Sequence, residues 1–323
     1  MSSQRDIFLT RLFERAKEDK DIYLISVDMG AASLDRWRQE LPDQFFAAGI
    51  SEQNAINFAA GLSAAGKKVY IYFMACWVAR CFEQIRYSCA MANNPITILG
   101  NGVALGYAPA GPAHEPTEDL TYMRSLCDIE IYSPTNGEVT EKLVDLTCDV
   151  PKLRYVRLER KYPEKLDNLS KNTKLTNEFI ERGLSVIRPE MPESSRQVSN
   201  NKVCILSSGY MLGRAIDVSE KLMTLGYEVG IVDLWRIKPI NSELFKQTVS
   251  PYEFLVTLEE QTLFGGFGSA VAEVVVDLSL DKDVLRIGLP ERYIFENGDR
   301  EHLLNTNGLS VESICEKIRT RLP

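Results

Sequence analysis

Apolar residues in the first part of the chain occur in two patterns. Short continuous runs at 22–27, 69–73 and 96–99 are typical of buried strands. In the stretches 4–17 and 54–66 the apolar residues instead recur at every third or fourth position, which predicts helices. The alternation of the two patterns predicts a parallel sheet with helices on both faces.

The rest of the chain continues this alternation. Further strands are expected at 129–132, 153–157, 202–207, 228–232, 253–258 and 284–287. Further helices are expected at 75–92, 118–127, 138–148, 210–225, 267–278 and 311–321. Loops are expected at 29–43 and 100–116, the second of which is rich in Gly, Pro and Ala.

Two polar stretches interrupt the alternation and indicate how the chain divides. The charged stretch 161–176 is typical of a linker, and 191–201 is a second polar excursion. We therefore expect an α/β fold with two doubly wound domains. The first is predicted at 1–165 and the second at 202–323, with the linker and the first part of the second domain at 166–201.

Composition narrows the range of partners and the cellular compartment. The chain has 37 basic and 45 acidic residues, a net charge of −8, which argues against nucleic acid or an anionic membrane as a partner. No apolar run is long enough to span a bilayer, and residues 1–20 lack the apolar core of a signal peptide. The seven cysteines form no Cys-x-x-Cys pair, which indicates free thiols and a cytoplasmic protein.

The segment Gly49-Ile50-Ser51-Glu52-Gln53-Asn54 opens the apolar helix at 54–66. Glu52 falls in the first turn, where the helix dipole favours a carboxylate, and Ser51 is a candidate N-cap. Taken alone, this position is that of an ordinary helix-terminal acid. The helix is too apolar for a surface helix, however, so Glu52 is expected to lie in an apolar pocket.

Further motifs follow Glu52 along the chain. They are Arg80-Cys81-Phe82-Glu83-Gln84-Ile85-Arg86, Gly111-Pro112-Ala113-His114-Glu115, Arg157-Leu158-Glu159-Arg160, Thr257-Leu258-Glu259-Glu260 and Gly265-Gly266-Phe267-Gly268-Ser269-Ala270-Val271-Ala272-Glu273. In this order, and with the Glu52 segment, they resemble the C-terminal half of a transketolase, a thiamine diphosphate enzyme. The resemblance covers nearly the whole chain and implies a pyrimidine-binding domain followed by a transketolase C-terminal domain.

The resemblance implies a cofactor site in the first domain. Glu52 would hydrogen-bond the aminopyrimidine ring of thiamine diphosphate and act as a catalytic residue. An aromatic side chain would stack on that ring, and Phe73 is the first choice, with Trp77 in reserve. Asp28, at the end of the first strand, and Arg80 complete the predicted cofactor-binding set.

The resemblance also implies residues that contact the substrate. His114 lies in the loop at 100–116, and an imidazole exchanges protons near neutral pH, so a catalytic proton-transfer or hydrogen-bonding role is expected. Arg160, and less directly Arg11, would hold the phosphate of a sugar phosphate, with Arg157 in the same patch. His302 lies in a charged segment and is expected to be structural or solvated.

The chain lacks one motif of the family. There is no Gly-Asp-Gly followed some thirty residues later by Asn, the motif that binds Mg²⁺ and the cofactor diphosphate. The resemblance therefore implies that a partner subunit, the N-terminal half of a split enzyme, supplies the magnesium ligands. This chain is expected to contribute no metal ligand, and the expected assembly is α2β2.

The substrate-binding loop also departs from the family. The segment Gly106–Gly111 carries no acid, Gly100-Asn101-Gly102 replaces a usual His, and Cys76 replaces a usual aromatic residue. We therefore predict a transferase of carbohydrate metabolism that moves a two-carbon ketol unit from a ketose or ketose phosphate to an aldehyde, on an unusual sugar.

Three alternatives remain open. They are the beta subunit of a 2-oxo-acid dehydrogenase, a deoxyxylulose-phosphate synthase-like half, and a non-catalytic scaffold subunit that kept the fold. The loop around His114 and the motif Arg157–Arg160 argue against the dehydrogenase. Glu52→Gln would distinguish a scaffold, which needs no such carboxylate, from an enzyme.

Overall fold

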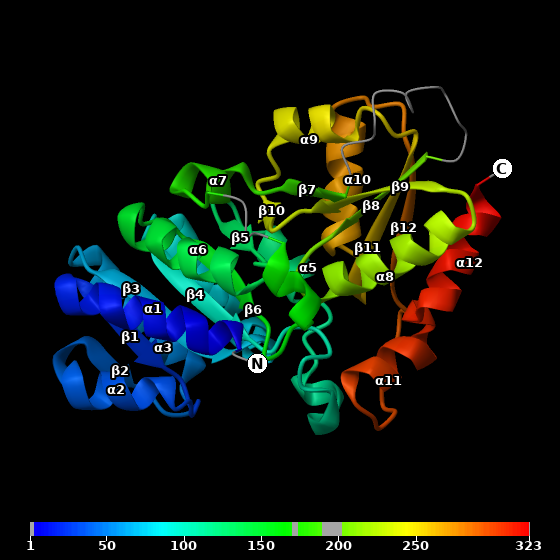
Figure 1. Cartoon of the computed structure of the whole chain (residues 1–323). Coiled ribbons are helices and arrows are strands. Elements are labelled where there is room, and N and C mark those ends of the chain that lie inside the picture. Colours follow the sequence, from blue (N-terminus) through cyan, green and yellow to red (C-terminus); the bar gives the residue numbers. More distant parts are fainter. Residues whose placement is uncertain (1–2, 170–173, 189–201, 323) are drawn as a thin grey trace.

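Two sheets organise the chain in the computed structural model, which describes residues 3–169, 174–188 and 202–322 (Figure 1). The first sheet has seven strands in the order β10-β5-β6-β4-β3-β1-β2, and the second has five in the order β12-β11-β8-β9-β7. All pairings are parallel except those of β10 with β5 and β7 with β9. The predicted fold, two α/β domains with mainly parallel sheets, is confirmed.

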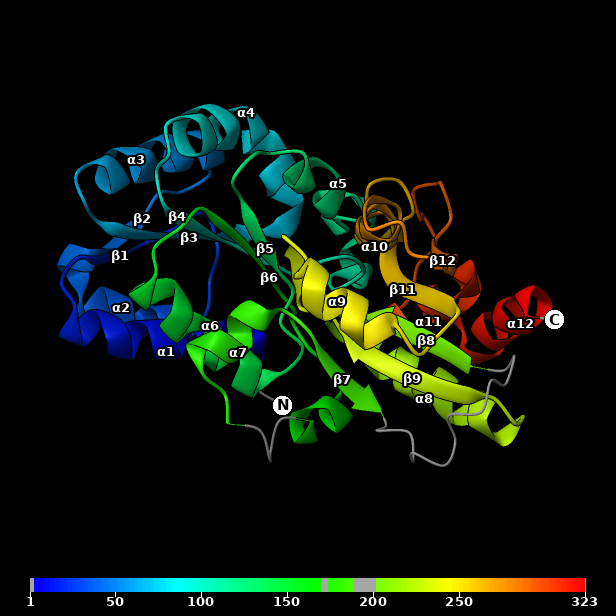
Figure 2. The ribbon, with the colours of Figure 1, turned by 90° about the horizontal axis from the view of Figure 1, so that it is seen from above.

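The first sheet is built mostly from the N-terminal half. Its strands are β1 (Ile22–Ser26), β2 (Phe45–Ala47), β3 (Lys68–Met74), β4 (Ile96–Asn101), β5 (Glu130–Tyr132), β6 (Arg154–Leu158) and β10 (Arg236–Lys238). Its helices are α1 (Gln4–Glu18), α2 (Ser33–Glu40), α3 (Glu52–Ala64), α4 (Phe82–Gln84), α5 (Asp119–Arg124), α6 (Gly137–Asp149) and α7 (Asn177–Arg182). Figure 2 shows α3 and α4 on one face of this sheet and α1 and α6 on the other.

The second sheet has the same layered arrangement. Its strands are β7 (Ser185–Arg188), β8 (Lys202–Ser207), β9 (Glu228–Asp233), β11 (Phe254–Thr262) and β12 (Asp283–Leu289). Its helices are α8 (Tyr210–Thr224), α9 (Ser242–Val249), α10 (Phe267–Asp277), α11 (Arg300–Leu304) and α12 (Val311–Arg321). One hydrophobic cluster includes both Ile71 of β3 and Phe267 of α10, so the two domains share part of their core.

Two local predictions were wrong. The expected loop at 29–43 contains α2, which buries Leu34 and Trp37 against α1. The expected helix at 75–92 is instead a 3₁₀ segment, η2 (Ala75–Cys81), followed by α4 and a π-helical segment, η3 (Ile85–Met91). Irregular helices of this kind are frequent at functional sites.

The predicted linker, polar excursion and domain boundaries lie partly or wholly outside the described residues or stay untested. The predicted linker at 161–176 is described except for 170–173, and it includes the 3₁₀ turn η6 (Glu164–Asn168). The predicted polar excursion at 191–201 lies outside the described residues. The domain boundaries at 165 and 201 stay predictions.

Candidate functional site

The candidate site lies beyond the carboxyl ends of the parallel strands of the first sheet. Strand β3 runs directly into η2, and β4 ends at Asn101 before the Gly-rich loop. Strand β6 leads into Glu159 and Arg160. Ligands of parallel α/β sheets bind at this edge, because the loops that leave adjacent strands converge there.

Glu52 begins α3, and its residue is only 4% exposed. Its contact with the nearest cationic group is long, 3.4 Å from Oε2 to Nη1 of Arg80, whose side chain is half exposed. Ser51 occupies the N-cap position, but its hydroxyl donates to the carbonyl oxygen of Ala48 (2.6 Å) rather than capping the helix. A buried carboxylate held by one weak contact is available to a ligand that donates a hydrogen bond.

The aromatic side chain that contacts Arg80 is Trp77, whereas Phe73 lies in the core. Phe73 is fully buried in the hydrophobic core, opposite Gly100 of β4, so neither face of its ring is available for stacking. Trp77, in η2, is half-buried, and the guanidinium carbon of Arg80 lies 4.8 Å from its ring centroid. The burial of Phe73 argues against the first choice from the sequence and favours the reserve, Trp77, as the stacking residue.

His114 comes close to Trp77 from the loop after β4. The two ring centroids lie 5.8 Å apart in an edge-to-face arrangement. The Nδ1 atom of His114 is buried and has no hydrogen-bond partner among the described residues. Side-chain contacts thus connect Glu52, Arg80, Trp77 and His114 in one cluster, although they lie far apart in sequence.

Cys76 adds an uncharged wall near Glu52. Burial raises the pKa of the Cys76 thiol to about 11, so the thiol stays protonated at neutral pH. All seven cysteines are free thiols.

Asp28, predicted to bind the cofactor, lies two residues after β1 at φ 44° and is exposed.

The loop at 106–111, which carries no acidic residue, places Tyr107 against Arg160. The phenol oxygen of Tyr107 accepts a hydrogen bond from Nδ2 of Asn101 (2.8 Å), and the guanidinium carbon of Arg160 lies 4.9 Å from the Tyr107 ring centroid. Gly102, at φ +73°, makes this possible, because a Cβ atom there would lie 1.9 Å from the Tyr107 ring. The Oδ1 atom of fully buried Asn101 has no partner within the described chain.

The predicted patch of three arginines is not formed, and this prediction is corrected. Arg11 pairs with Asp145 of α6 (2.7 Å), on the face of the sheet opposite to α3. Arg157 is buried and donates from Nε to Asp119 (2.9 Å). Of the three arginines, Arg160 is the exposed one at the strand edge, so it alone is free to bind an anion there.

Charged residues from both domains meet behind the site. Arg300 of α11 donates to Glu159 (2.8 Å) and Glu260 (2.8 Å), and it lies over the Tyr210 ring at 3.6 Å. Sequence reasoning missed Arg300, because its segment has the composition of a solvated run of charges. These ion pairs join α11 to the end of β6 and to β11, and removing one partner of such a buried pair would leave an uncompensated charge.

The glycine-rich motif of the second domain forms a helix start. Both oxygens of Glu259 accept hydrogen bonds from the backbone of α10, from Phe267 N (2.7 Å) and Gly268 N (2.8 Å). Burial raises the pKa of Glu259 to about 7. Gly266 is required there, because a Cβ atom would lie 2.3 Å from Oε2 of Glu259.

Metal-binding clusters and membrane-spanning helices are both absent from the described residues. No group of three or more His, Cys, Asp or Glu side chains within 3–169, 174–188 and 202–322 is placed to hold a metal ion. In the same ranges, no helix has the length and apolar character that a membrane crossing requires.

Comparison with known proteins identifies both domains. The family model of the transketolase pyrimidine-binding domain matches residues 3–163, and that of the transketolase C-terminal domain matches residues 193–314. An apulose-4-phosphate transketolase subunit of Phocaeicola vulgatus is 29% identical over 319 residues, which cover 98% of this chain and 96% of that protein. A putative transketolase C-terminal section of Methanocaldococcus jannaschii is 28% identical, covering 95% of this chain and 92% of that protein.

Other curated relatives are longer. The 1-deoxy-D-xylulose-5-phosphate synthase of Caldanaerobacter subterraneus is 28% identical over 322 residues, which are 99% of this chain but 49% of that protein. The chain thus spans nearly all of some relatives and about half of others.

Solved structures agree with this assignment. A split gene transketolase, described as an inactive beta4 tetramer, superposes with a TM-score of 0.84 at 27% identity and covers 100% of this chain and 99% of its own. A transketolase mutant from Pichia stipitis has a TM-score of 0.78 at 18% identity over 45% of its chain, which shows the shared fold.

Proposed function

The chain belongs to the transketolase family, and on that premise we propose that it is one subunit of a split transketolase-type enzyme that transfers a two-carbon ketol unit. The observation that carries the proposal is the cluster of Glu52, Arg80, Trp77 and His114 at the carboxyl edge of the first sheet. A scaffold subunit would not need a buried carboxylate with one weak partner.

The cluster fits the pyrimidine half of thiamine diphosphate. Glu52 would accept a hydrogen bond from the pyrimidine ring, in place of its long contact with Arg80. The half-buried Trp77 ring would stack on the pyrimidine, and the neutral Cys76 thiol adds no competing charge. When bound, thiamine diphosphate supplies the nucleophilic carbon that attacks the donor carbonyl.

Two residues would contact the sugar. The buried Nδ1 of His114 lacks a partner in the described structure, so the imidazole is poised to exchange a proton or hydrogen bond with a substrate hydroxyl or carbonyl. The exposed guanidinium of Arg160, oriented by the Tyr107 ring, would bind a phosphate bidentately.

A partner subunit would complete the site. Large apolar side chains are exposed just before α3, on α3 and on η3, which packs against α3, namely Ile50 (75%), Phe58 (40%), Tyr87 (66%) and Met91 (64%). A surface of this kind is typical of a protein interface. We propose that an N-terminal-half subunit covers it and supplies the Mg²⁺ and diphosphate ligands, in an α2β2 assembly. The free thiols suit a cytoplasmic location.

The experiment that tests the function is Glu52→Gln in the assembled enzyme. We expect ketol transfer dependent on thiamine diphosphate to fall by at least about a hundredfold, the size of effect typical of losing a catalytic hydrogen bond. Glu141→Gln, an exposed change on α6, serves as the matched control and should retain activity. Full activity in Glu52→Gln would refute the proposed role.

We further propose a sugar substrate outside the common pentose phosphates. One relative is named for apulose-4-phosphate, and here Tyr107 and Asn101 line a loop without acids. Steady-state assays with apulose 4-phosphate and xylulose 5-phosphate as alternative donors test this. If xylulose 5-phosphate had the higher kcat/KM, the substrate proposal would be wrong, while the ketol-transfer proposal would stand.

A second candidate is one half of a 1-deoxy-D-xylulose-5-phosphate synthase-like enzyme. Similarity to several such synthases, at 28–31% identity, favours it. The product decides between the two candidates, since a synthase would release a 1-deoxy sugar phosphate and a transketolase would not.

A further inference from the structure

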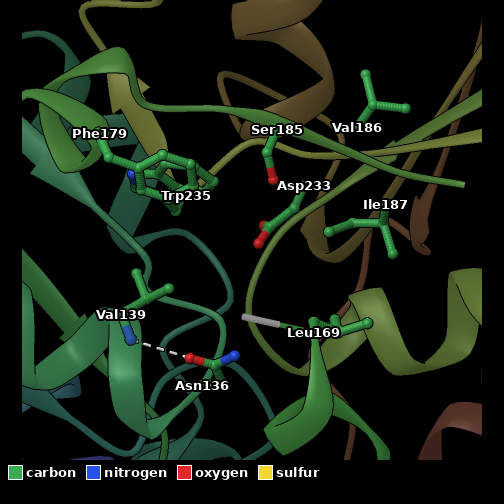
Figure 3. A pocket seen from close by; sticks show the side chains of 9 residues that line it. All are labelled: Asn136, Val139, Leu169, Phe179, Ser185, Val186, Ile187, Asp233 and Trp235. Carbon is green, nitrogen blue, oxygen red and sulfur yellow. Dashed lines mark hydrogen bonds between the residues drawn. The ribbon is translucent and has the colours of Figure 1, made fainter. Parts of the chain in front are cut away.

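A cavity of about 130 Å³ lies apart from the candidate site, where helices α6 and α7 meet strands β7 and β9 of the second sheet (Figure 3). It is bounded by the start of α6, by α7 and β7, and by the end of β9. Its lining residues are Asn136, Val139, Leu169, Phe179, Ser185, Val186, Ile187, Asp233 and Trp235. None of these belongs to the cluster around Glu52.

Asp233 is the one ionisable group in this lining. The residue is 3% exposed, and its Oδ2 accepts a hydrogen bond from the hydroxyl of Thr135. Its Oδ1 is buried and has no hydrogen-bond partner in the described structure. No ion pair of Asp233 occurs within the described residues, and burial raises its pKa to about 7. A carboxylate left so incompletely satisfied favours a cationic or hydrogen-bond-donating guest.

Two other polar side chains of the lining, those of Asn136 and Trp235, are already hydrogen-bonded. The side chain of Asn136 accepts from Val139 N (3.0 Å) and donates to Leu166 O (2.9 Å). The indole of Trp235 donates to Ile180 O (3.0 Å). Ser185, paired with Asp233 across β7 and β9, adds one hydroxyl on the same side, as Figure 3 shows. One carboxylate oxygen and one hydroxyl are too few ligands for Mg²⁺ or Ca²⁺.

The remaining wall is apolar and aromatic. Phe179 and Trp235 stack with their ring centroids 5.2 Å apart, and Val139, Leu169 and Ile187 close the cavity. A cavity of about 150 Å³ accommodates a benzene-sized molecule, so this one suits a guest of about four to six non-hydrogen atoms. Aromatic faces also attract cations.

We propose that this cavity binds a small organic cation whose ammonium group donates to Oδ1 of Asp233 while its short hydrocarbon part lies against Trp235 and the aliphatic wall. Because the walls come from elements flanking both sheets, the guest would hold α6 against β7 and β9. The site is independent of the proposed ketol transfer.

The test uses n-propylammonium as the probe and indole ¹⁵N–¹H signals of the full chain as the readout. The protein has three tryptophans, and Trp235 alone lines the cavity. We expect a saturable shift of the Trp235 signal. The signal of Trp37, which is buried beside α1 and donates to Leu9 O, should stay unchanged. Absence of a saturable shift up to about 50 mM probe would overturn the proposal.

Variants and neutral analogues sharpen the test. Asp233→Asn should weaken binding at least about tenfold, because a charge-assisted hydrogen bond is lost. Asp277→Asn, which removes an exposed charge on α10, is the matched control and should bind normally. Ile187→Phe fills the cavity, keeps Asp233 and should also abolish binding. Equal binding of the probe by Asp233→Asn would contradict the proposal, because the carboxylate would then not be needed. The same shift with 1-propanol or K⁺ would also contradict it, because the site would then not require an organic cation.

Discussion

Replacing Arg157 with methionine is expected to lower the free energy of unfolding by about 3–5 kcal/mol, because a buried ion pair loses one partner. Asp119 is fully buried and accepts from Arg157 Nε (2.9 Å), Arg157 Nη2 (3.2 Å), Tyr155 OH (2.7 Å) and Leu120 N (2.9 Å). In Arg157→Met two of these four donors disappear, and the buried carboxyl loses its cationic partner. Urea unfolding followed by circular dichroism measures the change.

A second substitution, Asp119→Asn, removes the carboxylate that Arg157→Met leaves without its cation. Arg157→Met with Asp119→Asn should recover at least about 1 kcal/mol relative to Arg157→Met alone, since no unpaired charge is then buried. Arg160→Met is the matched control, and its unfolding free energy should change by less than about 0.5 kcal/mol. The assignment of Arg157 to the fold would be refuted if Arg157→Met kept its stability and instead raised the KM for a phosphorylated sugar.

Three further predictions follow from the same geometry. Arg160→Met in the assembled enzyme should raise the KM for a phosphorylated substrate about tenfold with a smaller change in kcat, as expected for loss of a charged hydrogen bond; an unchanged KM would exclude phosphate binding by this residue. Gly102→Ala should displace the Tyr107 ring and cost about 1–3 kcal/mol of stability, measured by thermal unfolding, because the new Cβ meets the ring at φ +73°. Burial raises the pKa of Asp233 from 3.8 to about 7, so the folded state holds this proton more tightly than the unfolded state and stability falls as pH rises through that window. Melting temperatures of Asp233→Asn should fall less between pH 4 and 7 than those of the unsubstituted protein, and parallel curves would contradict the shift.

The alternation of apolar patterns predicted the architecture, because buried parallel strands and the helices that cover them leave distinct periods in the sequence. The elements that this pattern did not predict are those that depend on tertiary contacts. Strand β10 has three residues and pairs with β5 only because the second domain brings it there. The irregular helix from η2 to η3 has the apolar content of an ordinary helix, so its breaks leave no periodic signal.

The residues that meet at the candidate site were predicted in part from the sequence, and their roles stay predictions. Phe73 and Trp77 are both aromatic residues near the end of β3, but β3 is buried on both faces and holds Phe73 in the core, whereas Trp77 lies beyond the strand in η2. The resemblance put Arg160 first for the phosphate, but nothing in the sequence alone indicated that Arg157 is buried. Three residues earlier in the chain, Arg157 meets buried Asp119, which is distant in sequence. The contact between Tyr107 and Arg160 was not predicted, because it depends on the backbone conformation of Gly102, which leaves room for the Tyr107 ring.

Calorimetric titration of thiamine diphosphate with Mg²⁺ tests whether this chain forms only one part of the cofactor site. It is made into this chain alone and into its equimolar mixture with an N-terminal-half subunit. We expect saturable binding only in the mixture, and loss of that binding in a mixture containing Glu52→Gln. Equally tight binding by the chain alone, or a stable complex that binds no thiamine diphosphate, would contradict this expectation.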